Sequence, residues 1–191
     1  MEEFEIKFLE VDVSALEKKW LAIGAKKIGE YKYERAMFDY PDWRLDKNHA
    51  WLRLRTDGMK TTLTFKKRIG VKSNDGSIPD EGMQENEIEL SDYKKAFQIF
   101  ESLGFIVKLA IKNKRIKYEK GNVAYDIDFY PQIPPFVEIE ADSLDAVKRA
   151  ATELDFDPEK GLICSPTQVY NKYGINLNEY SSINFEEFVK R

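Results

Sequence analysis

The stretch Glu3-Phe4-Glu5-Ile6-Lys7 alternates charged and apolar residues without a break. Successive side chains of a β-strand point to opposite faces, so this stretch would place its charges on one face and its apolar residues on the other. The same pattern returns in three later stretches, 51–55, 84–89 and 137–140. Charged faces of both signs at this density indicate strands that line a shared polar interior.

Composition limits the class of protein. The chain has 191 residues, of which 42% are hydrophobic and 34% charged, enough for one well-packed domain. The net charge of −4 offers no basic field for duplex nucleic acid. A single cysteine, Cys164, excludes an intrachain disulfide and favours a reducing cytoplasm. No apolar run approaches the roughly 20 residues of a membrane span, so no membrane association is expected.

The scarcity of histidine narrows the chemistry. His49 is the only histidine, which disfavours histidine-rich zinc sites and Ser-His or Cys-His nucleophiles. Any metal would then be held by carboxylate oxygens, which suit hard ions such as Mg²⁺ or Mn²⁺.

Periodicity and cap signals predict a mixture of strands and helices. Ser14 and Glu17 suggest a capping box for the first helix, and Ser165-Pro166 marks the start of a later one. Helices are predicted over 12–24, 91–103, 143–154, 165–173 and 184–191. Strands are predicted over 3–8, 26–38, 50–56, 61–69, 83–90, 105–108, 112–120, 123–130 and 136–141. We expect one domain over residues 1–191, with a core over about 1–175, a helical tail over 176–191 and a long polar loop over 70–82.

A weak internal repeat relates residues 80 positions apart. Each half reads strand, helix, glycine, strand and arginine, and two such halves would close naturally into one barrel. The matching pairs are Glu5 and Glu85, Asp12 and Asp92, Gly24 and Gly104, and Arg35 and Arg115.

Closing the strands into a barrel would bring many charges inward. An eight-stranded barrel normally fills its interior with side chains, and buried ions are costly unless they are paired or hydrated. A polyphosphate with a divalent cation would satisfy bases and acids together. The inward acids would be Glu3, Glu5, Glu85, Glu87, Glu89, Asp126, Asp128, Glu138 and Glu140. The inward bases would be Lys7, Arg53, Arg55, Lys66, Arg68 and Arg115.

These stretches together resemble the CYTH superfamily, the triphosphate tunnel metalloenzymes. The opening stretch resembles the Glu-x-Glu-x-Lys signature, and the resemblance extends over about residues 1–175. Four further stretches of this chain resemble the later motifs of the family, in the same order. They are Leu52-Arg53-Leu54-Arg55, Leu63-Thr64-Phe65-Lys66, Glu85-Asn86-Glu87 and the Asp128 to Glu138-Ile139-Glu140 spacing. The resemblance implies an α+β fold in which an eight-stranded antiparallel β-barrel, the tunnel, carries helices on its outside.

The resemblance also implies roles for individual residues. The metal, Mg²⁺ or Mn²⁺, would be held by Glu3, Glu5, Asp128, Glu138 and Glu140. The phosphates would be bound by Lys7, Arg53, Arg55, Lys66, Arg68 and Arg115. The catalytic residues would be Glu85, Glu87 and Lys7, with the two glutamates at a second metal or orienting a water molecule.

One position departs from the family pattern. The family often carries Lys-x-Arg where this chain has Asn113 before Arg115, with Lys112 and Lys114 beside it. Either a bulge turns Lys112 or Lys114 inward to the phosphates, or the tunnel has one cation fewer at that level. A contact between Lys172 and the substrate is not expected, because the ending of the chain also departs from the commoner one.

The predicted activity is metal-dependent hydrolysis of a small triphosphate, either thiamine triphosphate or inorganic tripolyphosphate. An adenylate cyclase that converts ATP to cyclic AMP and pyrophosphate is the alternative, and an RNA 5′-triphosphatase is disfavoured by the acidic net charge. Two non-enzymatic alternatives are a module that binds polyphosphate or nucleotides without catalysis, and a barrel whose internal ion pairs are purely structural. We expect a cytoplasmic monomer or homodimer.

Overall fold

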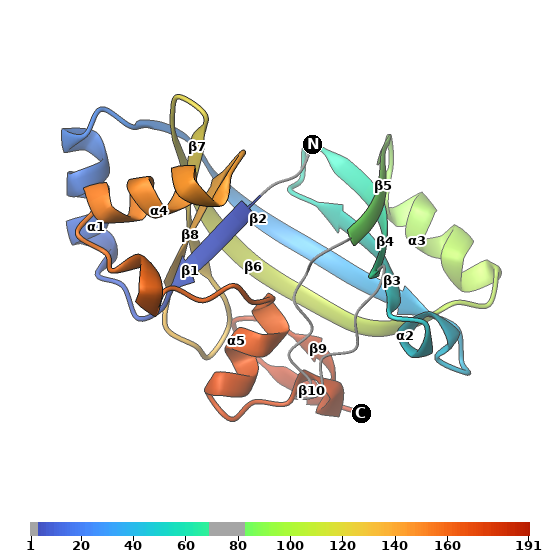
Figure 1. Cartoon of the computed structure of the whole chain (residues 1–191). Helices are drawn as coiled ribbons and strands as arrows, with labels where there is room; N and C mark the ends of the chain where they lie inside the picture. Colours follow the sequence, from blue (N-terminus) through green and yellow to red (C-terminus); the bar gives the residue numbers. More distant parts are fainter. Residues whose placement is uncertain (1–3, 69–82) are drawn as a thin grey trace. The chain divides into compact units, whose positions relative to one another are not determined.

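The computed structural model describes residues 4–68 and 83–191 (Figure 1). The chain divides into two compact units, and each is described by itself. The first unit comprises Met1–Tyr31 and Asn113–Ile175, and the second comprises Lys32–Lys112 and Asn176–Arg191. The single domain predicted for residues 1–191 stays a prediction. Glu3 and the predicted loop over 70–82 lie outside the described residues, as does the side chain of Arg68.

The first unit is an antiparallel ladder in the order β1-β8-β7-β6. Strands β2 and β6 are long and contribute residues to both units. The strands are β1 (Phe4–Phe8), β2 (Lys26–Asp39), β6 (Ile106–Lys120), β7 (Val123–Phe129) and β8 (Phe136–Ala141). The helices are α1 (Val13–Ala22), α4 (Leu144–Glu153), the 3₁₀ turn η1 (Pro158–Lys160) and α5 (Pro166–Lys172).

The apolar face of this ladder packs under α1 and α4 (Figure 1). Trp20 of α1 is fully buried, with its ring 5.0 Å from that of Tyr118 and 5.5 Å from that of Tyr125. Val147 and Ala151 of α4 join the same core. Because one face is filled in this way, the opposite face of the same four strands is left to the charged residues.

The second unit repeats this design in the order β2-β3-β4-β5, with α3 on the apolar face. Phe38 is fully buried there, and its ring lies 5.2 Å from that of Phe97 and 5.1 Å from that of Phe100. The strands are β3 (Ala50–Thr56), β4 (Thr61–Arg68), β5 (Met83–Leu90), β9 (Tyr180–Ile183) and β10 (Phe188–Lys190). The helices are α2 (Arg44–Lys47), α3 (Tyr93–Ser102) and the 3₁₀ turn η2 (Leu177–Glu179).

The fold class predicted from the sequence, α+β with a mostly antiparallel sheet, is confirmed. Among the described residues, neither ladder closes on itself, because β1 is an outer strand of the first ladder and β5 is an outer strand of the second. Among those residues, no helix has the length and apolar composition needed to span a bilayer.

Two local predictions were wrong. The first helix is capped by Asp12, whose carboxylate accepts from the Ala15 amide at 3.0 Å, and Ser14 lies inside the helix. The tail is not helical at its end, because Phe188–Lys190 forms β10 and pairs with β9. The Phe188 ring packs 5.1 Å from that of Tyr180, which adds a side-chain contact to the pairing of β10 with β9.

The internal repeat is visible in the structure. Asp92 caps α3 as Asp12 caps α1, each accepting from the amide three residues on. Gly24 and Gly104 follow the two helices with φ of +83° and +85°, a left-handed conformation that favours glycine. The segments β1-α1-β2 and β5-α3-β6 are therefore built in the same way.

Candidate functional site

The charged face of the first unit is set by strand register. Glu5 lies opposite Glu140 and Lys7 opposite Glu138 across the β1–β8 pair, so the four side chains share one face. Lys7 is fully buried, and its Nζ contacts a Glu5 carboxylate oxygen and lies 2.9 Å from Glu138 Oε2. The lysine thus neutralises carboxylates from two neighbouring strands.

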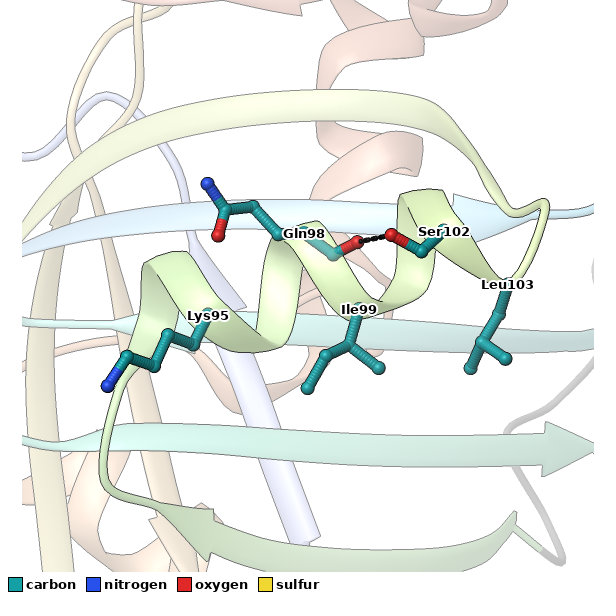
Figure 2. Close-up of a pocket in the computed structure, with 5 residues that line it drawn as sticks. All are labelled: Lys95, Gln98, Ile99, Ser102 and Leu103. Carbon is teal, nitrogen blue, oxygen red and sulfur yellow. Dashed lines mark hydrogen bonds between the residues drawn. The ribbon is translucent and has the colours of Figure 1, made fainter.

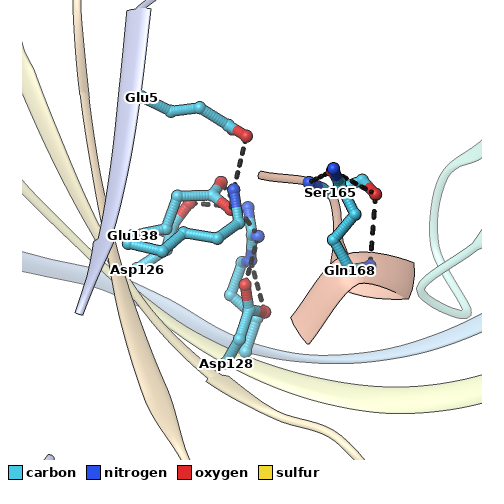
Figure 3. A network of polar contacts seen from close by, with 8 residues as sticks. Glu5, Asp126, Asp128, Glu138, Ser165 and Gln168 are labelled. Carbon is cyan, nitrogen blue, oxygen red and sulfur yellow. Dashed lines mark hydrogen bonds and ion pairs between the residues drawn. The ribbon is translucent and has the colours of Figure 1, made fainter. Parts of the chain in front are cut away.

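Arg115 of β6 binds the carboxylates on β7 and β8 (Figure 3). Its Nε and Nη2 donate to the two oxygens of Asp128 at 2.8 and 2.5 Å, in the bidentate geometry that suits guanidinium and carboxylate. Its Nη1 donates to Asp126 at 2.6 Å, and Nη2 also reaches Glu138 at 3.2 Å. We call this set the acidic cluster: Glu5, Lys7, Arg115, Asp126, Asp128, Glu138 and Glu140.

The acidic cluster strongly perturbs its members. Burial and the Glu138 charge raise the pKa of Glu5 to about 7, although Lys7 opposes this. Burial raises the pKa of Asp126 to about 7 as well, against the lowering effect of Arg115. Burial would lower the pKa of the Arg115 guanidinium, but the charges of Asp128 and Glu138 raise it. Glu5 and Asp126 therefore lose a proton less readily than ordinary carboxylic acids, and Arg115 holds its proton more firmly than an ordinary arginine.

Three carboxylates of the acidic cluster could hold a divalent cation. Oxygens of Glu5, Glu138 and Glu140 all lie within 4.8 Å of one another. A set of convergent carboxylate oxygens fits Mg²⁺ or Mn²⁺. Asp128, also predicted as a metal ligand, is instead held by Arg115. The predicted ligand set stays a prediction.

The charged face of the second unit gathers arginines. Arg35 of β2 lies directly opposite Arg55 of β3, and both guanidiniums lie over the Tyr33 ring, at 5.1 and 5.2 Å from its centroid. Arg53 lies on the same face of β3, two residues before Arg55. We call Arg35, Arg53 and Arg55 the arginine cluster. Like charges directly opposite one another destabilise a sheet, so this arrangement calls for an anion.

The surroundings of Arg53 disfavour its charged form. Burial, followed by the charges of Arg55 and Arg35, lowers the pKa of Arg53 to about 10. Its Nη2 donates to Thr64 Oγ1 at 3.2 Å and lies 3.7 Å from Glu87. Its buried Nε, like the buried Thr62 hydroxyl opposite Arg55, has no hydrogen-bond partner among the described residues. Phosphate oxygens are acceptors that would satisfy both groups.

The two glutamates predicted as catalytic lie beside the arginine cluster on β5. Glu85 pairs with Lys66 at 2.6 Å, and Glu87 accepts from Thr64 at 2.6 Å. Lys66, Glu85 and Glu87 therefore share one face of the second unit with Arg53. Their catalytic and phosphate-binding roles stay predictions.

The strand around Asn113 settles the geometry of the departure from the family pattern. Strand β6 is continuous over Ile106–Lys120, and its register against β7 is regular from Lys114 onward. Asn113 is buried, whereas Lys112 and Lys114 are exposed. This alternation of exposed and buried residues places both lysines on the face of β6 opposite to Asn113. It favours the expectation of one cation fewer at that level, which stays a prediction.

Sequence reasoning missed the placement of Arg35 and the central role of Asp126. Arg35 is matched to Arg115 by the repeat, and that match was the available signal for it. Asp126 was expected to face inward, but only the register shows that it lies opposite both Glu138 and Lys117.

A hollow elsewhere on the molecule has a different character. It lies along the exposed side of α3 and is lined by Lys95, Gln98, Ile99, Ser102 and Leu103 (Figure 2). The Ser102 hydroxyl donates to the Gln98 carbonyl at 2.8 Å, a bond internal to the helix. With one cation, two neutral polar side chains, two apolar ones and no carboxylate, this hollow has no group that suits metal binding.

Comparison with known proteins identifies the family and the fold. A family model described as the CYTH domain matches residues 1–163. The PH1012 protein from Pyrococcus horikoshii OT3 is structurally similar, with a TM-score of 0.67 and 24% identity over 84% of this chain and 94% of that one. No functionally curated protein sequence was found to match.

Two further structures are similar at lower identity. One, from Vibrio parahaemolyticus, is proposed to be an adenylate cyclase and has a TM-score of 0.71 and 15% identity over 88% of this chain and 97% of that one. The other is HpAC1 from Hippeastrum, described with a dominant triphosphatase activity, with a TM-score of 0.60 and 17% identity over 94% of this chain and 99% of that one. At these identities the likeness concerns the tunnel fold.

Proposed function

This chain belongs to the CYTH domain family, and we propose that it catalyses the metal-dependent hydrolysis of a small triphosphate. The substrate would be thiamine triphosphate or inorganic tripolyphosphate. Cyclisation of ATP to cyclic AMP and pyrophosphate is the second candidate, and the HpAC1 neighbour, with its dominant triphosphatase activity, illustrates how close the two reactions stand.

The arginine cluster is the observation that carries the proposal. Two arginines face each other across β2 and β3, and burial and the charges of both lower the pKa of Arg53. An arrangement of this kind costs stability in the free protein and is relieved by a bound polyanion. A triphosphate offers several anionic oxygens in a chain, which suits several forked donors on adjacent strands.

The acidic cluster supplies the second requirement. Glu5, Glu138 and Glu140 would hold Mg²⁺ or Mn²⁺, which when bound neutralises phosphate charge and polarises phosphoryl oxygens. Lys7, which contacts Glu5 and Glu138, keeps these carboxylates paired in the free protein. Glu85 or Glu87 would orient the attacking water, and the basic groups would stabilise the charge that develops on the leaving group.

An assay panel tests the proposal. The purified protein is offered thiamine triphosphate, tripolyphosphate and ATP, each with Mg²⁺ and with Mn²⁺, while phosphate, pyrophosphate and cyclic AMP are read separately. We expect metal-dependent release of phosphate. Pyrophosphate with cyclic AMP would establish the cyclase instead.

Two outcomes would overturn the enzymatic proposal. Binding of triphosphates without any turnover would leave a binding module, and calorimetric silence towards all three would leave a structural barrel. Cytoplasmic location and a monomeric or homodimeric state stay predictions.

A further inference from the structure

Asn113 is a buried polar residue without any hydrogen bond. The residue is 1% exposed, and neither its side-chain nitrogen nor its side-chain oxygen has a partner among the described residues. Buried amides in folded proteins are nearly always satisfied, and an orphaned donor and acceptor together destabilise the free protein. Such a group is expected where a ligand completes it.

The strand places this amide beside the acidic cluster. Asn113 precedes Arg115 by two residues on the continuous strand β6, so the two side chains leave the same face. Arg115 is bound to Asp126, Asp128 and Glu138 on that face. The amide is therefore a neutral group at the margin of a strongly charged site.

Its chemistry differs from that of the lysine it stands for. An ammonium only donates, and it suits a phosphate oxygen. A carboxamide offers a donor and an acceptor side by side, and its full satisfaction needs a ligand group with both. Bare tripolyphosphate held by a divalent cation offers acceptors alone. An aminopyrimidine edge, present in thiamine and in adenine, offers an acceptor nitrogen next to an amino group. Asparagine forms a bidentate pair with the similar edge of adenine made by the N6 amino group and N7, so the same donor and acceptor pairing is available here.

We infer that Asn113 binds the aminopyrimidine edge of an organic triphosphate and so selects it over inorganic tripolyphosphate. This inference rests on the proposed function and narrows its substrate class. It also accounts for the missing cation, because a lysine here would favour a further phosphate oxygen over a neutral ring.

Three substitutions test the assignment. Asn113→Leu keeps the approximate size and removes both hydrogen-bonding groups, Asn113→Ala removes the amide if the leucine does not fold, and Asn113→Lys restores the family cation. Affinities for thiamine triphosphate, ATP and tripolyphosphate are measured by calorimetry with Mg²⁺, together with kcat/KM and the melting temperature of the ligand-free protein. Asn122→Leu, in the exposed turn between β6 and β7, is the matched control.

We expect Asn113→Leu to weaken binding of at least one organic triphosphate by roughly 10-fold, with tripolyphosphate changed less than about 3-fold. The melting temperature without ligand should rise, because a buried orphan amide is removed. Asn113→Lys should reverse the preference in favour of tripolyphosphate. Whichever of thiamine triphosphate and ATP loses affinity in the leucine variant is the ring that the amide contacts.

Contradictory outcomes separate the inference from the proposed function. If the leucine and alanine variants change all three ligands alike, or none of them, or lower the melting temperature, the amide is satisfied within the protein and the inference is wrong. If the wild-type protein neither binds nor hydrolyses any of the three, the proposed function itself fails.

Discussion

The two units solve the same structural problem with opposite electrostatics. Each is a four-stranded antiparallel ladder with an apolar face under helices and a charged face opposite. In the acidic cluster, four of the five carboxylates contact a cation of the same cluster, since Lys7 contacts two carboxylates, Arg115 contacts three, and Glu138 contacts both cations. In the arginine cluster, two guanidiniums face each other across neighbouring strands.

A single residue type shows the contrast. The charges of carboxylates raise the pKa of Arg115 against the effect of burial, whereas burial and neighbouring guanidiniums lower the pKa of Arg53. The first arginine is bound by three carboxylates, and the second lies among like charges whose repulsion a bound anion would relieve. Like charges that crowd one another on a sheet face thus favour the binding of an oppositely charged ligand there.

The largest expected effect concerns the carboxylates that would hold the metal. Glu5→Gln should lower metal-dependent kcat/KM by roughly 1,000-fold or more, because it removes an anionic ligand. The fold should persist, since Glu5 keeps 38% of its side chain exposed. Steady-state kinetics with Mg²⁺ and circular dichroism check this. Glu159→Gln, at a highly exposed glutamate, is the control, and wild-type kinetics in Glu5→Gln would mean that the metal site is misplaced.

The next effect tests how far Arg115 stabilises the buried carboxylates of the first unit. Arg115→Met should lower the free energy of unfolding by about 3–5 kcal/mol, because it leaves Asp126, Asp128 and Glu138 buried without their shared cation. Lys117→Met on the same strand face should cost less than about 1 kcal/mol, since that lysine is partly exposed. Chemical denaturation measures both. Equal losses in the two variants would remove the claimed distinction.

The arginine cluster should respond in the opposite sense. Arg55→Ala should weaken triphosphate binding by roughly 10- to 100-fold, because a desolvated charge-assisted contact is lost. The same change should stabilise the ligand-free protein by about 0.2–1 kcal/mol through relief of the Arg35 repulsion. Calorimetry and thermal melting report the pair of effects. Arg44→Ala, at an exposed arginine, should show neither, and a less stable Arg55→Ala protein would refute the repulsion.

The last prediction concerns a pH dependence of the stability of the first unit. The folded pKa of Asp126 is raised to about 7, so below that pH the folded state holds a proton that the unfolded state, with an ordinary pKa near 3.8, releases. The free energy of unfolding of the ligand-free protein should therefore fall as pH rises from about 4 to 7, by at most about 1.4 kcal/mol per pH unit for this group. Denaturation at pH 5.5 and 8 measures the slope, and Asp126→Asn should reduce it to the part that Glu5, with its pKa also raised to about 7, contributes. An unchanged slope in that variant would contradict the assignment.

Much of the fold could be predicted because the alternation of charged and apolar residues can be recognised within each strand by itself. The stretch from Phe4 to Phe8 gives its own two faces, and the repeat correctly related the helix caps Asp12 and Asp92. What lies beyond alternation depends on pairing between distant strands. Only register shows that Arg35 meets Arg55 and that Asp126 lies between Glu138 and Lys117. The end of the chain was mispredicted because its strand gains stability from pairing with β9, which no local pattern reveals.

Titration of tripolyphosphate into the wild-type protein and Arg55→Ala, both with Mg²⁺ and at two salt concentrations, tests the central claim most directly. The account predicts saturable binding to the wild type that raises its melting temperature, weakens with salt, and is at least about 10-fold weaker in the variant. No heat and no change in melting temperature, or equal binding by the two proteins, would contradict it.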